Sequence, residues 1–142
     1  MPEASLDLER LRGKLGVEWE PHSYPIERGM ISRFVQAVGD PNPLWRGGNI
    51  APPTFVLAIG LEQFNQDLLS IAPFNTLLMG STEIECYQPI KTGAVITVSF
   101  KMTSLRQRGG KMGRMAFMTF DSTYKNQNQG LVARCRQMVI GY

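Results

Sequence analysis

The strongest constraint on the fold of this 142-residue chain is a change of hydrophobic period along its length. From Ala94 to Thr103 every second residue is apolar, and segments 115–124 and 131–140 are rich in apolar, aromatic and β-branched residues. A period of two predicts β-strands with one buried face. Turns rich in glycine or amide side chains separate the strands, at residues 91–93, 108–111 and 126–130. With a further strand expected at 77–87, the C-terminal half is predicted to form an antiparallel meander.

The N-terminal half shows helical spacing instead. Leucines spaced by three and four residues predict a first helix within Pro2–Leu15, which Gly16 ends. A short extended segment, 19–26, is expected to follow it. Over Glu27–Val38 apolar residues recur at steps of three and four, which predicts a helix with one buried face and Gly39 as its C-terminal cap.

A second and more apolar helix is expected after the proline-rich stretch 40–53. Pro52 and Pro53 suit its first turn, where backbone N–H groups have no partner inside the helix. The helix is predicted to span about Thr54–Leu69, and because it is apolar on most sides it should be buried. We therefore predict one α+β domain over 1–142, a hot-dog fold in which a curved antiparallel sheet wraps a long central apolar helix.

Composition argues against several classes of protein. A net charge of +3, without a block of like charges or a basic stripe, does not favour nucleic acid as a partner. No stretch approaches the roughly 20 apolar residues of a membrane-spanning helix, and residues 1–12 do not resemble a secretory signal. Cys86 and Cys135 lack a close CxxC spacing, so free thiols in a reducing cytoplasm are expected. No cofactor is expected, and the methionines between Met102 and Met118 favour core packing over a metal site.

Four short motifs carry the functional information. In chain order they are Tyr24–Arg28, Gly39–Leu44, Pro52–Phe55 and Pro89–Gly93. With these motifs in this order and spacing, the sequence resembles the MaoC-like hydratase and dehydratase family, in particular its N-terminal, FAS1-like dehydratase branch. The resemblance extends over nearly the whole chain, and it implies the hot-dog fold.

The resemblance also implies an acyl-thioester site around Asp40. In active members an aspartate and a histidine five positions later hold and deprotonate the water that adds to a trans-2-enoyl thioester. The reverse reaction dehydrates a 3-hydroxyacyl thioester, and backbone N–H groups at the start of the buried helix polarise the thioester carbonyl. Here Asp40 occupies the aspartate position, but Trp45 occupies the histidine position, and an indole is not a base near neutral pH.

Both residues also have a purely structural interpretation. Asp40 and Asn42 are typical turn residues that bond nearby backbone N–H groups, and Trp45 is typical of core packing or of a pocket wall. In the vestigial-site interpretation, its indole is expected to fill part of the site next to Asp40. The one histidine, His22, lies upstream and is expected to be an exposed loop residue.

Basic residues flank the glycine pair of a predicted hairpin; they are Arg106, Arg108, Lys111 and Arg114. They either protect a solvated strand edge or contact the phosphates of coenzyme A or of a carrier protein's phosphopantetheine arm. The other expected substrate contacts lie at and just before the start of the central helix. They are Trp45, Pro53, Thr54, Phe55 and Ile59.

Three functions remain open. The first is a subunit of a 3-hydroxyacyl-thioester dehydratase or (R)-specific enoyl-thioester hydratase that supplies pocket walls while a partner supplies the histidine. The second is a hot-dog thioesterase that uses Asp40 alone, and the third is a non-catalytic acyl-thioester-binding protein. In each case the ligand is an acyl-CoA or acyl-carrier-protein thioester. An unpaired sheet edge predicts a dimer, either of two copies or with a MaoC-like subunit that keeps both aspartate and histidine.

Overall fold

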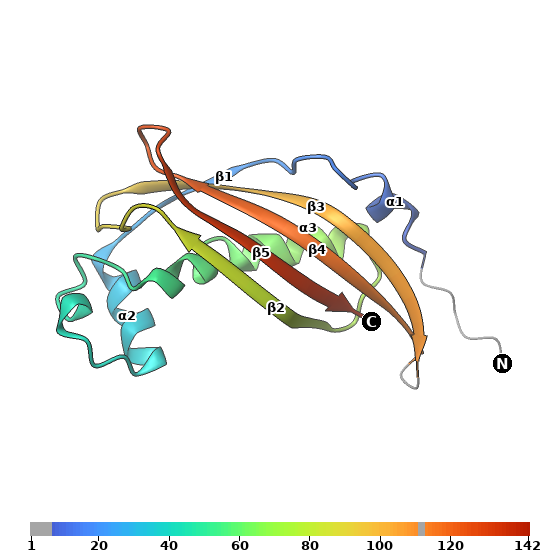
Figure 1. Cartoon of the computed structure of the whole chain (residues 1–142), viewed down its shortest axis with the longest axis horizontal. Coiled ribbons are helices and arrows are strands. Elements are labelled where there is room, and N and C mark those ends of the chain that lie inside the picture. The colour runs from blue at the N-terminus through green and yellow to red at the C-terminus, as the bar shows by residue number, and fades with distance from the viewer. Residues whose placement is uncertain (1–6, 111–112) are drawn as a thin grey trace.

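The computed structural model describes residues 7–110 and 113–142 as a curved antiparallel sheet wrapped around a helix (Figure 1). The sheet has five strands in the spatial order β1-β3-β4-β5-β2. In that order their bounds are His22–Pro25, Val95–Gly110, Gly113–Lys125, Leu131–Gly141 and Leu77–Cys86. The predicted α+β hot-dog fold is therefore confirmed.

The three C-terminal strands form the predicted meander, since β3 pairs with β4 and β4 pairs with β5, all antiparallel. β2 precedes them in the chain but does not join β3; it pairs with β5 at the far edge of the sheet. β1 forms the other edge through a short antiparallel pairing with β3. The described sheet therefore ends in two edge strands, β1 and β2.

Helix α2, Arg28–Val38, confirms the helix expected from the apolar spacing. It ends at Gly39, whose left-handed backbone (φ 70°) suits a glycine cap. The ring of Phe34 packs edge to face on that of Phe55, with ring centroids 5.5 Å apart. The segment that begins at Asp40 thus leaves a helix that is anchored to the core.

Among the described residues, the first predicted helix is wrong for residues 13–15. Within the described residues it is reduced to α1, Glu9–Arg12, with Leu11 buried. Beyond α1 the backbone bonds to β3 instead, because the N–H of Gly16 donates to the carbonyl oxygen of Met102 at 2.8 Å. Leu15 is consequently not on a buried helix face and is 48% exposed. Pairing with the sheet outweighs the helical spacing of the leucines.

The predicted bounds of the central helix, Thr54–Leu69, are wrong, because this segment is divided into two helices. A 3-10 helix, η2 (Pro53–Ala58), is followed by Gly60 in the left-handed region (φ 77°) and then by α3 (Leu61–Ile71). The ring of Tyr24 lies against Gly60, where a Cβ atom would be 3.2 Å from the ring carbon Cε2. Both the backbone angle and this close approach therefore favour glycine at the break.

α3 lies along the concave side of the sheet, as Figure 1 shows. The ring centroid of Phe64 is 5.9 Å from that of Trp19 and 4.8 Å from those of Phe100 and Phe120. Leu68 is fully buried on the same helix. The predicted buried helix therefore exists, although it is shorter than expected. No helix among the described residues has the length and apolar character needed to cross a membrane.

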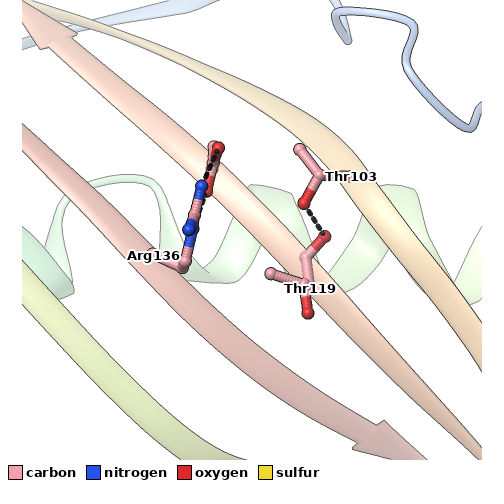
Figure 2. A network of polar contacts seen from close by, with 4 residues as sticks. Thr103, Thr119 and Arg136 are labelled. Atoms are coloured by element: carbon pink, nitrogen blue, oxygen red, sulfur yellow. Dashed lines mark hydrogen bonds and ion pairs between the residues drawn. The ribbon is translucent and has the colours of Figure 1, made fainter.

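The opposite face of the sheet carries paired polar groups (Figure 2). Arg136 on β5 donates two hydrogen bonds to the Asp121 carboxylate on β4, at 2.8 and 3.1 Å. This contact lowers the pKa of Asp121. The hydroxyl of Thr103 on β3 donates to the carbonyl oxygen of Thr119 at 3.5 Å. The sheet is thus apolar toward α3 and polar on its other side, as expected when one face is solvated.

Candidate functional site

The segment after α2 folds around the side chain of Asp40. Asp40 Oδ1 accepts a hydrogen bond from the N–H of Asn42 at 2.9 Å, and Asn42 Oδ1 accepts one from the N–H of Leu44 at 3.0 Å. The second bond caps η1, a 3-10 turn over Pro43–Trp45. These local bonds from side chain to backbone are those expected of turn residues.

Trp45, at the end of η1, turns its ring back toward Asp40. The indole Nε1–H donates to Asp40 Oδ2 at 2.9 Å in a part-buried contact. Each carboxylate oxygen therefore already accepts one hydrogen bond, from a backbone N–H or from the indole. We call this contact the Asp40–Trp45 pair. The structure thus brings together the two residues at the positions that the resemblance assigns to aspartate and histidine.

Two contacts that the sequence did not predict hold the far end of this loop, although the donors lie in two of the sequence motifs. Arg28 on α2 donates to Asn49 Oδ1 at 2.9 Å, and the hydroxyl of Thr92 donates to the carbonyl oxygen of Gly48 at 2.5 Å. Gly48 is left-handed (φ 71°), and a Cβ atom there would lie 2.7 Å from Arg28 Cγ and from Ser32 Oγ. The pair of glycines in the sequence at this point is the signal that could have indicated such a close approach.

Two cavities share Trp45 as a lining residue. The smaller has a volume of about 200 Å³ and contains Asp40, and we call it the Asp40 cavity. The larger, of about 270 Å³, we call the apolar cavity. Polar side chains line much of the Asp40 cavity, and they are Ser32, Gln36, Asp40, Asn42 and Arg46. The apolar cavity is lined mainly by hydrocarbon, including Ile50, Ala51, Pro52, Val56, Ile90 and Val132.

The start of η2 offers few backbone donors. Pro52 and Pro53 have no N–H, and the N–H of Phe55 already donates to the carbonyl oxygen of Pro52 at 2.9 Å. Thr54 is exposed, and its N–H makes no hydrogen bond within the described chain. Thr54 therefore supplies the one free donor at the point where the resemblance implies polarisation of a thioester carbonyl.

The other residues expected to contact substrate lie apart from one another. Pro53 borders the apolar cavity, whereas Phe55 is 2% exposed and belongs to the core. Ile59 lines a third cavity, of about 420 Å³, together with Tyr24. The structure therefore groups Pro53 with Trp45 and places Phe55 and Ile59 elsewhere.

The predicted basic residues lie far from the Asp40–Trp45 pair. Arg106 and Arg108 are exposed on the last part of β3. That part of β3 lies at the opposite end of the molecule's long axis from α2 and the loop that follows it (Figure 1). Lys111 lies outside the described residues. Within one chain, Arg106 and Arg108 therefore do not share a site with Asp40.

The one histidine of the chain faces a different carboxylate. His22 Nε2 is 3.6 Å from Asp67 Oδ2 on α3, and the two side chains are 35% and 38% exposed. Asp67 Oδ1 also accepts a hydrogen bond from Gln63 Nε2 at 2.9 Å. The prediction of an exposed loop residue is wrong, because His22 belongs to β1 and turns toward α3. On the same strand, burial and, to a smaller extent, the charge of Asp67 raise the pKa of Tyr24.

Known structures share this fold. The MaoC-like dehydratase of Rhodospirillum rubrum matches with a TM-score of 0.65 and 19% sequence identity, over 90% of this chain and 92% of that chain. The HadBC (3R-hydroxyacyl-ACP dehydratase) complex of Mycobacterium tuberculosis matches with a TM-score of 0.73 and 17% identity, over 90% of this chain and 97% of that chain. Fold and sequence motifs together define a MaoC-like hot-dog protein of the dehydratase type.

Within that class, the chain belongs to the family described as the FAS1-like, dehydratase domain region, which matches residues 14–135. A "UPF0336 protein" of Thermobifida fusca (strain YX) is 28% identical over 113 residues, which are 70% of this chain and 74% of the relative. The family expected from the four sequence motifs is thus confirmed. The chain is a domain of the acyl-thioester dehydratase type.

Proposed function

We propose that the chain is the substrate-pocket subunit of a 3-hydroxyacyl-thioester dehydratase or enoyl-thioester hydratase and lacks a working catalytic pair of its own. The observation that carries this proposal is the Asp40–Trp45 pair. Its indole N–H donates to the carboxylate at 2.9 Å in the place where a base is needed. A partner subunit that keeps both aspartate and histidine supplies the chemistry.

Hydration requires a group that takes a proton from water while the water adds to the β-carbon of the enoyl thioester. The indole nitrogen is a donor only and accepts no proton near neutral pH. Asp40 could still act as an acceptor, yet its two oxygens are engaged by the N–H groups of Asn42 and Trp45. A reacting water would have to displace one of these two donors from Asp40. The same engagement argues against a thioesterase that uses Asp40 as its single carboxylate.

The start of η2 supports the same proposal. A thioester carbonyl that develops negative charge is stabilised by N–H groups aimed at its oxygen. Pro52 and Pro53 supply none, and the N–H of Phe55 is bonded within the turn, so Thr54 alone remains. A site with one such donor and without the histidine suits binding better than turnover.

The sheet edges suit a partner of the same fold. On the edge strand β2, Leu78 and Met79 are 47% and 49% exposed, and edge strands with exposed apolar residues favour pairing with another chain. The HadBC neighbour is itself a complex. A thioester bound across two subunits would let Arg106, Arg108 and Lys111 of one chain contact the phosphates of coenzyme A or of a carrier arm.

The proposal is tested by measuring hydration of crotonyl-CoA by the pure chain, by a MaoC-like subunit with an intact aspartate and histidine from the same source, and by their mixture. We expect the pure chain to be at least about a hundredfold slower than the mixture, because a missing general base costs about a hundred- to ten-thousand-fold in rate. Light scattering should show a complex in the mixture. A pure chain that turns over crotonyl-CoA as fast as the intact subunit would refute the proposal.

A further inference from the structure

We infer that Trp45 sets the length of the acyl group that this protein accepts. Trp45 confines the acyl group to the apolar cavity and separates that cavity from Asp40. This inference rests on the proposed function, since it takes an acyl thioester as the ligand. It concerns specificity and does not require the chain to be catalytic.

The floor of the apolar cavity is hydrocarbon that water does not reach. Val56 is fully buried, and Val132 and Ala133 are 2% and 1% exposed. Ala51 and Ile90 complete the buried wall and are joined by a backbone hydrogen bond of 2.9 Å, from the N–H of Ala51 to the carbonyl oxygen of Ile90. Binding of hydrocarbon to a concave apolar surface of this kind is favourable, because it removes further apolar area from water.

The polar side chains at the rim of the cavity are already bonded to the protein. The hydroxyl of Tyr87 donates to the carboxylate of Glu85. Gln88 Nε2 donates to the carbonyl oxygen of Leu131 at 3.3 Å, and Gln88 Oε1 accepts a hydrogen bond from Asn126 at 3.3 Å. A polar ligand would therefore find few partners here, and its desolvation would go uncompensated. An alkyl chain has no such requirement.

Trp45 separates this hydrocarbon space from the carboxylate. Trp45 lines both the apolar cavity of about 270 Å³ and the Asp40 cavity of about 200 Å³. The bond from the indole N–H to Asp40 holds the ring in this position. An acyl chain that grows within the apolar cavity therefore meets the indole, and removing the indole should join the two spaces.

The first test measures binding of saturated acyl-CoA thioesters, from butyryl to dodecanoyl, by calorimetry. For the unaltered protein, affinity should rise by about fourfold for each methylene that fits the apolar cavity and then stop rising. In Trp45→Ala the rise should continue to longer chains. Trp45→Phe keeps an aromatic wall without the hydrogen bond, so its longest accepted chain should match that of the unaltered protein more closely than that of Trp45→Ala.

The second test uses Cys86, an exposed thiol that lines the apolar cavity. A bound acyl chain should slow its reaction with a disulfide reagent several-fold. Cys135 serves as the internal control, because it is buried and its burial raises the pKa of its thiol to about 11. Cys86→Phe adds a ring at the exposed rim of the apolar cavity and should weaken the binding of acyl groups of every length. This variant tests the cavity while Trp45 is unchanged.

The outcomes separate this inference from the proposed function. If acyl-CoA binds but Trp45→Ala keeps the unaltered length limit, or Cys86 is not protected, the inference about Trp45 is wrong and the proposed function stands. If no acyl-CoA binds to the chain alone or in its complex, both fail. A longer limit in Trp45→Ala together with protection of Cys86 supports the inference.

Discussion

Among the described residues, two carboxylates face a ring nitrogen, and the two contacts differ in both geometry and chemistry. In the Asp40–Trp45 pair the contact is a part-buried hydrogen bond of 2.9 Å, but the ring is an indole. Between Asp67 and His22 the ring is an imidazole, a group that can exchange a proton near neutral pH. There, however, the atoms are 3.6 Å apart, and the side chains are 35% and 38% exposed.

Under the proposed function, residue type and position must coincide before the site can catalyse hydration. The Asp40–Trp45 hydrogen bond lies where the family motif places the reaction, and it has an indole in place of the histidine. The histidine has an acidic neighbour but lies on β1, outside the four motifs that carry the family resemblance. We therefore propose that the ligand binds near Trp45 and that the contact between β1 and α3 has a structural role.

The largest expected difference between the two pairs is in stability. The carboxylate of Asp40 accepts two hydrogen bonds, from the N–H groups of Asn42 and Trp45. Asp40→Asn removes the charge from both bonds and turns an NH₂ group toward one of the donors, so we expect the free energy of unfolding to fall by about 2 kcal/mol. Asp67→Asn should cost less than about 0.5 kcal/mol, because solvent screens an ion contact this exposed. Urea unfolding of both variants measures the difference. Equal losses would show that the two contacts contribute equally to stability, contrary to this prediction.

Double-mutant cycles sharpen the same comparison by isolating each pair. For Asp40→Ala with Trp45→Phe we expect a coupling of about 1 to 1.5 kcal/mol, the net value of a hydrogen bond to a charged group in a part-buried setting. For Asp67→Ala with His22→Phe the coupling should lie between about 0 and 0.5 kcal/mol. A larger coupling in the second cycle would reverse the ranking of the two pairs.

A smaller effect should appear in alkali, through Tyr24 beside Asp67. Burial and the charge of Asp67 raise the pKa of Tyr24, so the folded protein holds the phenolic proton more tightly than the unfolded chain does. The stability that this proton contributes is present below the ordinary tyrosine pKa of about 10 and is lost as pH rises through the raised value. Stability should therefore fall less steeply above pH of about 10 in Tyr24→Phe than in the unaltered protein. Identical slopes would show that Tyr24 is not perturbed.

The smallest expected effect concerns His22 in the reaction itself. Because His22 lies outside the binding site proposed here, His22→Gln should change acyl-CoA affinity, and hydration by the mixed complex, by less than about twofold. A kinetic comparison of complexes with and without the substitution measures this. A tenfold loss of rate with unchanged affinity would move the chemistry to the Asp67–His22 contact.

Much of the fold could be predicted from the sequence because its signals are local. Alternation over Ala94–Thr103 and the three-and-four spacing of Glu27–Val38 each report one buried face, and both segments form the expected element. Apolar spacing did not predict the break at Gly60, where a left-handed backbone and the nearby ring of Tyr24, distant in sequence, both favour glycine. The placement of β2 beside β5 likewise depends on pairing across the whole sheet.

The candidate site was predictable in part for the same reason. Asp40 and Trp45 are five positions apart, so a motif could place them together, and the structure joins them directly. Arg28 and Thr92 lie in two of the sequence motifs, but their hydrogen bonds to Asn49 and Gly48 join distant segments and could not be predicted from spacing along the chain. Phe55 was expected at the pocket because it lies in the first turn, yet the break in the helix leaves it in the core.

The most direct test of the account is the rate of crotonyl-CoA hydration by Trp45→His, compared with the unaltered chain and with the double variant Asp40→Asn, Trp45→His. An imidazole in place of the indole restores a base beside Asp40 and opens the space between the two cavities. We expect Trp45→His to raise the hydration rate at least about a hundredfold. This is the low end of the gain from a general base, because η2 offers few N–H donors. The double variant should lose this gain. A folded Trp45→His protein no faster than the unaltered chain, or an unaltered chain that is already fast, would contradict the claim that Trp45 disables this site.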